Sequence, residues 1–77
     1  MFLKERIFRI ASQILNVPRG QLNDKSSLGT TVNWDSFRHM NLILSLEEEF
    51  NVSFLEEEII EMTSLETIVK KVKEKCK

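Results

Sequence analysis

Residues 34–50 read WDSFRHMNLILSLEEEF and decide the fold of this chain. Asp35 is a residue type that caps helices, and apolar residues recur after it at intervals of three and four. The stretch therefore predicts an amphipathic helix from Ser36 to Phe50, which Asn51 is suited to end. Leu42 is expected on the rim of the apolar face, open to solvent. The expected apolar face consists of Phe37, Met40, Ile43, Leu44, Leu46 and Phe50, and the polar face of Arg38, Asn41, Ser45, Glu48 and Glu49.

The sequence before this stretch predicts a first helix, from about residue 2 to residue 16, and then a long loop. The apolar stripe of the helix is formed by Leu3, Ile7, Phe8, Ile10, Ala11, Ile14, Leu15 and Val17. Pro18 and Gly20 end this helix. Residues 17–35 are rich in Asn, Ser, Thr, Asp and Gly, which indicates a loop, and so long a loop in a small domain usually has a function. The expected anchors of the loop in the core are Leu22, Leu28, Val32 and Trp34.

Two capping-box patterns after residue 50 predict two further helices. Residues 53–56, SFLE, open a short helix that ends near residue 62, and residues 63–66, TSLE, open the last helix. The residues expected to face inward are Leu55, Ile59, Met62, Leu65, Ile68, Val69 and Val72. Because 77 residues are too few for two hydrophobic cores, we expect one all-α domain over residues 1–77. Its predicted architecture is a four-helix bundle of three longer helices and one short helix, with the long loop between the first and second helices.

The charges are distributed unevenly along the chain. Between His39 and Val69 there are eight acidic residues and no Lys or Arg, so about half of the surface is available to a basic partner. The lysines within residues 70–77 are interpreted as a solvated helix face near a helix C-terminus, rather than as a site for membrane or nucleic acid. The net charge of −1 also argues against nucleic acid as the main partner.

The use of cysteine and histidine argues against two other classes of protein. The single cysteine, Cys76, cannot form an internal disulfide, and one Cys with one His cannot build a structural zinc site. The sequence has no recognisable Gly-rich phosphate loop, signal peptide or segment that could span a bilayer. We therefore expect a soluble, cytoplasmic protein that inserts stably into no membrane and holds no metal.

Ser36 is the candidate residue for chemistry. It lies in the first turn of the predicted helix, directly after the acidic cap and the long loop, where its hydroxyl is expected to be exposed. A phosphate ester formed there would lie at the positive end of the helix dipole, close to unpaired backbone N–H groups. Taken alone, however, Asp-Ser before a helix is a common capping pattern, so these two residues by themselves favour a structural role for Ser36.

The wider sequence changes that interpretation. Residues 34–50 closely resemble the segment around the modified serine of acyl and peptidyl carrier proteins, where an Asp-Ser-Leu motif opens the second helix and a Leu-Glu-Glu-Glu-Phe-like run closes it. Helix order, loop length and the short-helix region extend the resemblance over the whole chain. It implies that Ser36 receives 4′-phosphopantetheine from coenzyme A through a Mg²⁺-dependent phosphopantetheinyl transferase, and that Asp35 belongs to the transferase's recognition site. Such a protein holds acyl groups as thioesters on the arm and shuttles them between enzymes, without being an enzyme itself.

The resemblance also implies how partners are bound. Acyl-loading and acyl-processing enzymes would dock through basic patches onto the second helix. The implied docking residues are Phe37, Arg38, Asn41, Glu47 and Glu48. An acyl chain could lie against apolar residues of the second and third helices, although ordinary core packing is the commoner role of each one. The residues considered for such a pocket are Met40, Leu46, Ile59 and Met62.

Departures from the common carrier pattern bear on the pathway. Phe37 replaces the usual Leu after the serine, and residues 31–33, TVN, replace the frequent Asp-Leu-Gly, with Asn33 at a position where a left-handed conformation is tolerated. Fatty-acid-synthesis carriers often have acidic residues early in the second helix, where this chain has Arg38, His39 and Asn41. Because Trp34 and His39 resemble carriers of specialised or peptide-synthesis pathways, we expect a specialised lipid, polyketide or similar pathway. A peptidyl or aminoacyl carrier is the alternative.

Two other functions compete with that of a carrier. In a hydrolase, Ser36 would be the nucleophile and His39 its base, since residues three apart on a helix are neighbours. No third group or Gly-rich elbow supports the pair, so His39 is interpreted as a surface histidine. An unmodified interaction module could keep both the fold and the serine. Because a carrier presents several faces to its partners, a monomer is expected.

Overall fold

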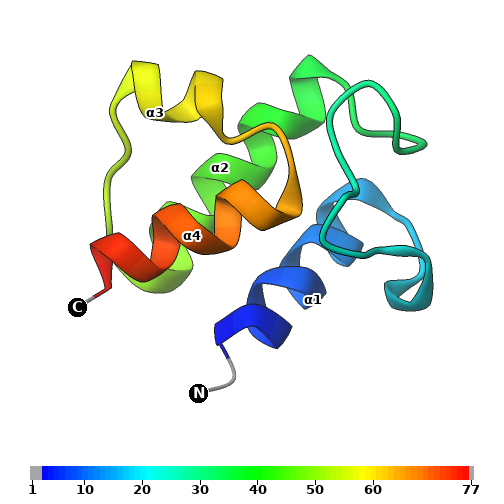
Figure 1. Cartoon of the computed structure of the whole chain (residues 1–77), viewed down its shortest axis with the longest axis horizontal. Helices are drawn as coiled ribbons and strands as arrows, with labels where there is room; N and C mark the ends of the chain where they lie inside the picture. Colours follow the sequence, from blue (N-terminus) through cyan, green and yellow to red (C-terminus); the bar gives the residue numbers. More distant parts are fainter. Residues whose placement is uncertain (1–2, 77) are drawn as a thin grey trace.

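The computed structural model describes residues 3–76, which form four α-helices. The helices are α1 (Leu3–Leu15), α2 (Ser36–Phe50), α3 (Glu56–Glu61) and α4 (Leu65–Lys75), and a short 3-10 helix, η1 (Arg19–Gln21), lies in the long loop. Figure 1 shows these helices in chain order. The predicted four-helix arrangement is confirmed, with three longer helices and one short one, and α2 has the predicted bounds.

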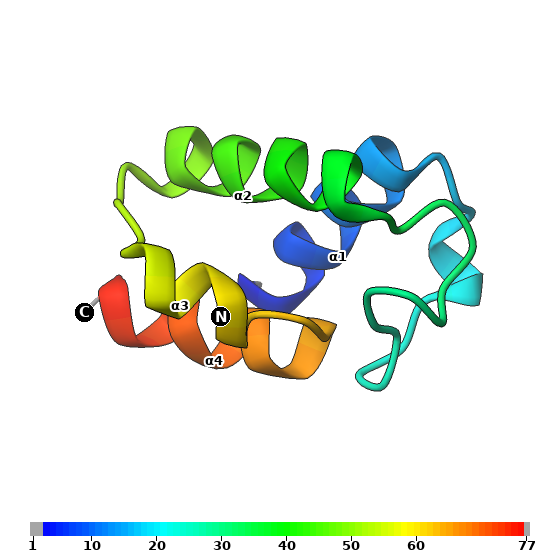
Figure 2. The same cartoon turned by 90° about the horizontal axis from the view of Figure 1, so that it is seen from above.

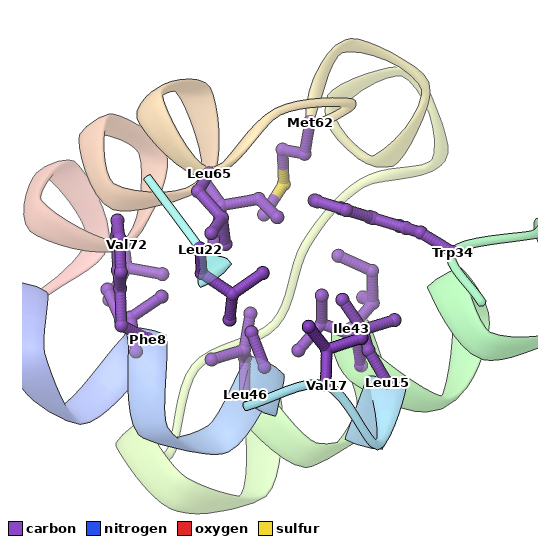
Figure 3. Close-up of a cluster of buried hydrophobic side chains, with 14 of the residues drawn as sticks. Phe8, Leu15, Val17, Leu22, Trp34, Ile43, Leu46, Met62, Leu65 and Val72 are labelled. Atoms are coloured by element: carbon purple, nitrogen blue, oxygen red, sulfur yellow. The ribbon is translucent and has the colours of Figure 1, made fainter. Parts of the chain in front are cut away.

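The helices enclose one hydrophobic cluster. Figure 2 shows α2 along one side of the molecule, α3 and α4 along the opposite side, and the long loop at one end. α1 packs against both α2 and α4. Figure 3 shows Trp34 reaching from the loop into this cluster, among side chains of α1, α2 and α4. The buried apolar side chains are Ile7, Phe8, Ala11, Leu15, Val17, Leu22, Trp34, Leu42, Ile43, Leu46, Phe54, Met62, Leu65, Ile68 and Val72.

The buried face of α2 differs from the predicted one. Leu42, expected on the rim, is fully buried, whereas Phe37 is 75% exposed and Leu44 is 54% exposed. Met40 is also exposed, and His39, expected on the surface, is buried. Residues 39, 42, 43 and 46 form the inward stripe, with spacings of three, one and three residues. The prediction was wrong because apolar residues occupy two adjacent stripes of this helix, and only packing selects one of them.

The long loop is attached to the connection between α3 and α4. The Leu28 N–H donates to the Thr63 carbonyl (2.8 Å), and the Leu65 N–H donates to the Ser26 carbonyl (3.0 Å). Leu22 and Trp34 are buried and Leu28 is half-buried, as predicted. Val32 is 63% exposed, so its prediction as an anchor was wrong, because this part of the loop turns back toward Trp34 at the surface.

The starts of the last two helices lie later than predicted. Ser53 does not open the short helix as predicted: α3 begins only after Leu55, whose N–H donates to the Glu58 carboxylate (2.8 Å). Phe54, between these two residues, is buried in the core. Leu55 is exposed rather than inward. The cap of α4 is Ser64, not the residue before it: its hydroxyl accepts from the Thr67 N–H. The remaining predicted inward residues are buried or half-buried: Ile59, Met62, Leu65, Ile68, Val69 and Val72.

The first helix agrees with its predicted apolar stripe, but it ends at Leu15, before the predicted Asn16 and before Pro18 and Gly20; Phe2, its predicted start, lies outside the described residues. Of its expected stripe, Ile7, Phe8, Ala11 and Leu15 are buried, and the remaining members within α1 are half-buried. The left-handed backbone of Asn16 (φ 56°) ends α1, and that of Asn51 (φ 54°) ends α2. No helix of the described residues is long and apolar enough to cross a membrane.

Candidate functional site

Ser36 is the first residue of α2 and is exposed, and its surroundings follow from the capping of that helix. The Asp35 side chain accepts from the Arg38 N–H (2.9 Å), and the Asp35 carbonyl accepts from the His39 N–H (2.8 Å). Within residues 3–76, the N–H groups of Ser36 and Phe37 have no hydrogen-bond partner. The hydroxyl of Ser36 therefore lies beside free amides at the positive end of the helix dipole, an environment that suits a phosphate ester.

The turn that carries Ser36 is fastened to the end of α1. Asn33 adopts a left-handed conformation (φ 70°), and its side-chain amide donates to the Leu15 carbonyl (3.0 Å). The Arg38 guanidinium donates to the Ile14 carbonyl (2.8 Å). Both bonds use carbonyls that the C-terminus of a helix leaves free, so they also cap α1. As a result, the turn that presents the exposed Ser36 is bonded at two points to the C-terminal end of α1.

Trp34 holds the same turn from inside the protein. Its N–H donates to the Thr31 carbonyl (3.1 Å), and its carbonyl accepts from the Gly29 N–H (3.1 Å). Its buried indole N–H donates to Nδ1 of His39 (3.1 Å). Trp34 thus has three hydrogen bonds, immediately before Asp35 and Ser36.

His39 does not act as the base of a hydrolase. Its Nδ1 accepts from Trp34, and its Nε2 faces the Ile59 carbonyl at 3.4 Å, so both ring nitrogens are engaged away from Ser36. The interpretation of Ser36 and His39 as a nucleophile–base pair is therefore wrong. The sequence analysis did not predict the burial of His39. Its spacing of three and four residues from Leu42 and Ile43 is that of residues on one helix face, and this spacing could have indicated burial.

Two open pockets flank Ser36. One, of about 310 Å³, has an almost wholly apolar lining and lies between α2, α3 and the loop; its lining residues are Leu28, Ser36, His39, Met40, Ile59, Ile60 and Thr63. The other, of about 450 Å³, lies against the loop; its lining residues are Leu28, Gly29, Thr31, Asn33, Trp34, Asp35 and Ser36. Of the residues considered for an acyl pocket, Met40 and Ile59 line the first cavity, whereas Leu46 and Met62 are fully buried in the core.

The predicted docking residues fall into two groups. Phe37, Asn41 and Glu48 are exposed on the outer face of α2. Arg38 and Glu47 are half-buried and make bonds within the protein: Arg38 to α1, and Glu47 by accepting from the Phe54 N–H (2.9 Å). The outer face of α2 therefore combines an apolar part, around Phe37, with an acidic end.

Much of the acidic charge around the site is neutralised within the fold. Glu49 pairs with Arg6, Glu61 with Lys71 (3.5 Å) and Glu58 with Lys75 (2.9 Å). The hydrogen bond from the Leu55 N–H, followed by the contact with Lys75, lowers the pKa of the Glu58 carboxyl below its ordinary value. No ion pair is present for Glu48, Glu56 or Glu57 within the described residues, so these carboxylates are open to a partner. The described part of the chain has no cluster of side chains suited to a metal ion.

Two known proteins are similar to this chain over most of its length. An acyl carrier protein of Buchnera aphidicola subsp. Baizongia pistaciae is 32% identical over 66 residues, which cover 86% of this chain and 85% of that protein. The solution NMR structure of a holo acyl carrier protein from Geobacter metallireducens superposes with a TM-score of 0.84 at 27% identity, over 97% of this chain and 86% of that one. No family model matches the sequence. On its identity and coverage, the chain belongs to the acyl carrier protein family, whose members are carriers and not enzymes.

Proposed function

We propose that Ser36 is the attachment residue for 4′-phosphopantetheine and that the protein carries acyl groups as thioesters on the terminal thiol of that arm. The observation that supports this most directly is the exposed hydroxyl of Ser36 at the first turn of α2, beside the unpartnered amides of Ser36 and Phe37. The holo form of the Geobacter metallireducens relative and the membership of the family support the same cofactor.

The residues around Ser36 fit such a group. In the attachment, the hydroxyl oxygen of Ser36 forms the new bond to phosphorus and loses its proton, and adenosine 3′,5′-bisphosphate leaves from coenzyme A. The free amides and the helix dipole stabilise the resulting phosphodiester charge. The carboxylate of Asp35 is engaged with the Arg38 N–H and so is drawn toward its own helix. The loop and α1 hold the turn in place for the transferase.

The apolar pocket beside Ser36 is proposed as the place where part of the cargo is sheltered. Its apolar lining favours hydrocarbon over charged groups, so an acyl chain fits better than an amino acid with its free ammonium group. We therefore favour a carrier of acyl groups, in a specialised lipid, polyketide or similar pathway in the cytoplasm. An aminoacyl or peptidyl carrier is the second candidate.

Partner enzymes, among them the phosphopantetheinyl transferase, are proposed to dock on the outer face of α2. Phe37, Met40 and Leu44 are exposed apolar residues there, and Asn41 and Glu48 add polar and acidic groups. Such a surface fits a partner with an apolar centre and a basic rim. Arg38 and Glu47 contribute less directly, since their side chains also bind within the carrier.

The proposal is tested by intact mass spectrometry after incubation with coenzyme A, Mg²⁺ and a broad-specificity phosphopantetheinyl transferase. The expected result is the addition of one phosphopantetheine group to the wild-type protein and none to Ser36→Ala. Ser53→Ala is the matched control, because Ser53 is also exposed but lies in the connection before α3. Failure of the folded wild-type protein to gain mass with several transferases would indicate an unmodified interaction module.

A further inference from the structure

His39 is the only histidine of the chain and is 6% exposed, in the second turn of α2. The function proposed above gives it no role beyond lining the apolar pocket. Because the Trp34 indole N–H can only donate, Nδ1 of His39 has to be the acceptor and carries no proton. The proton of the neutral ring is therefore on Nε2, which faces the Ile59 carbonyl at 3.4 Å.

These two contacts join three parts of the protein around Ser36. Trp34 belongs to the loop and precedes Asp35 and Ser36 directly, whereas Ile59 belongs to α3 and lines the apolar pocket. His39 itself lies one turn after Ser36 and lines the same pocket. Trp34 lines the second pocket that flanks Ser36. The Trp34–His39 pair thus lies between the two cavities open to a group attached there.

The charged groups around His39 are bound elsewhere. On α2, the Asp35 carboxylate accepts from the Arg38 N–H, and the Arg38 guanidinium donates to α1. On α3, Glu58 precedes Ile59 but binds Lys75 and the Leu55 N–H. The loop and the α3–α4 connection supply only the uncharged pocket residues Leu28 and Thr63. No carboxylate of the described chain bonds to the imidazole, so the Trp34 indole and the Ile59 carbonyl are its polar partners within residues 3–76.

We propose that His39, which accepts from the Trp34 indole at Nδ1 and faces the Ile59 carbonyl with Nε2, is a positioning residue for Ser36 that fastens the loop and α3 on either side of the attachment site. The bond itself can be tested whether or not the protein is a carrier, but its consequence for Ser36 rests on the function proposed above.

The bond is tested by NMR, using the single tryptophan of the chain as a reporter. His39→Asn keeps an acceptor near the place of Nδ1, and His39→Leu removes the acceptor. We expect the indole N–H resonance of Trp34 to be downfield and protected from exchange in the wild-type protein and in His39→Asn, and to lose both properties in His39→Leu. An indole resonance that is the same in all three proteins would overturn the proposal.

The consequence for Ser36 is tested with the transferase. We expect kcat/KM for phosphopantetheine transfer to fall by about two- to tenfold in His39→Leu, the range for one lost net hydrogen bond. In His39→Asn it should recover in part, because Asn offers an acceptor to Trp34 but has no atom at the place of Nε2 to face the Ile59 carbonyl. Should His39→Leu fail to fold, Trp34→Phe removes the donor of the same bond and takes its place. Equal rates in all variants would refute the positioning role, whereas absence of transfer to the wild-type protein would refute the attachment at Ser36 and leave the NMR result valid.

Discussion

Asp35 has an observed role and a proposed one, which substitutions can separate. Its side chain caps α2 by accepting from the Arg38 N–H, and we propose that the transferase recognises its negative charge. Asp35→Ala should lower the free energy of unfolding by about 1 kcal/mol, the usual value of an N-cap, whereas Asp35→Asn should retain most of it. Urea unfolding of both variants measures this difference.

The same two variants test whether the transferase recognises the charge of Asp35. If the transferase recognises the charge, kcat/KM for modification of Ser36 should fall in Asp35→Asn although its stability is close to that of the wild-type protein. An Asp35→Asn variant that is modified at the wild-type rate, beside a slow and unstable Asp35→Ala, would show that only the cap matters.

At the scale of the element, the orientation of α2 about its own axis predicts that two leucines of this helix contribute very differently to stability. Leu42 is fully buried, and Leu44, two residues later on the same helix, is 54% exposed. Leu42→Ala should lower the free energy of unfolding by about 2–5 kcal/mol, because it leaves a cavity in the core. Leu44→Ala should change it by less than about 0.5 kcal/mol, as surface substitutions do. Equal losses in chemical denaturation would contradict the observed orientation of α2.

The contact between α3 and α4 predicts a dependence of stability on pH. The hydrogen bond from the Leu55 N–H and the nearby Lys75 lower the pKa of Glu58, so the folded state favours the ionised carboxylate. Its contribution is therefore fully present above the unfolded pKa and is lost as the pH falls through the lower pKa of the folded state.

We expect Glu58→Gln to be less stable than the wild-type protein near neutral pH and to approach it in acid. Urea midpoints measured from about pH 7 to about pH 3 test this expectation. The matched control is Glu57→Gln, since Glu57 is an exposed neighbour in α3 without an ion pair in residues 3–76. A difference between Glu58→Gln and the wild-type protein that persists unchanged in acid would count against the ion pair.

At the scale of the whole molecule, the four helices should differ in local stability. α3 has six residues, none of them fully buried, and contacts the rest of the protein through the half-buried Ile59, through Met62 at its end and through the Glu58–Lys75 ion pair. So short a helix is not stable alone, whereas α1, α2 and α4 each bury several side chains. In hydrogen exchange followed by NMR, the amides of α3 should exchange faster than those in the centres of the other helices. Protection in α3 equal to that in α2 would contradict this expectation.

This difference also bears on cargo. α3 supplies Ile59 and Ile60 to the pocket beside Ser36. If α3 is the least stable helix, we expect local movement of α3, rather than of α1 or α2, to make room for an acyl chain in this pocket.

Much of the fold could be predicted because its signals are local. Asp35 and Asn51 mark the ends of α2, and each acts through bonds within its own turn of the chain. Ser36 was a candidate for the same reason, since its position follows from the cap before it. The exposure of Val32 and Leu55 could not be predicted, because each depends on where a distant segment packs. The spacing of His39 from Leu42 and Ile43 is compatible with burial, but only packing selected that stripe of α2.

The sequence alone determined the number and order of the helices, the start of α2 at Ser36 and the resemblance to carrier proteins, since capping, helix periodicity and motif spacing act over a few residues. Only the tertiary structure decided which stripe of α2 faces the core. The stretch from Phe37 to Leu46 has apolar residues on two neighbouring stripes, so periodicity cannot distinguish them. Trp34 of the loop is buried in the core, and its indole N–H requires a hydrogen-bond acceptor there. His39 supplies this acceptor only when the stripe of α2 that contains His39 faces inward.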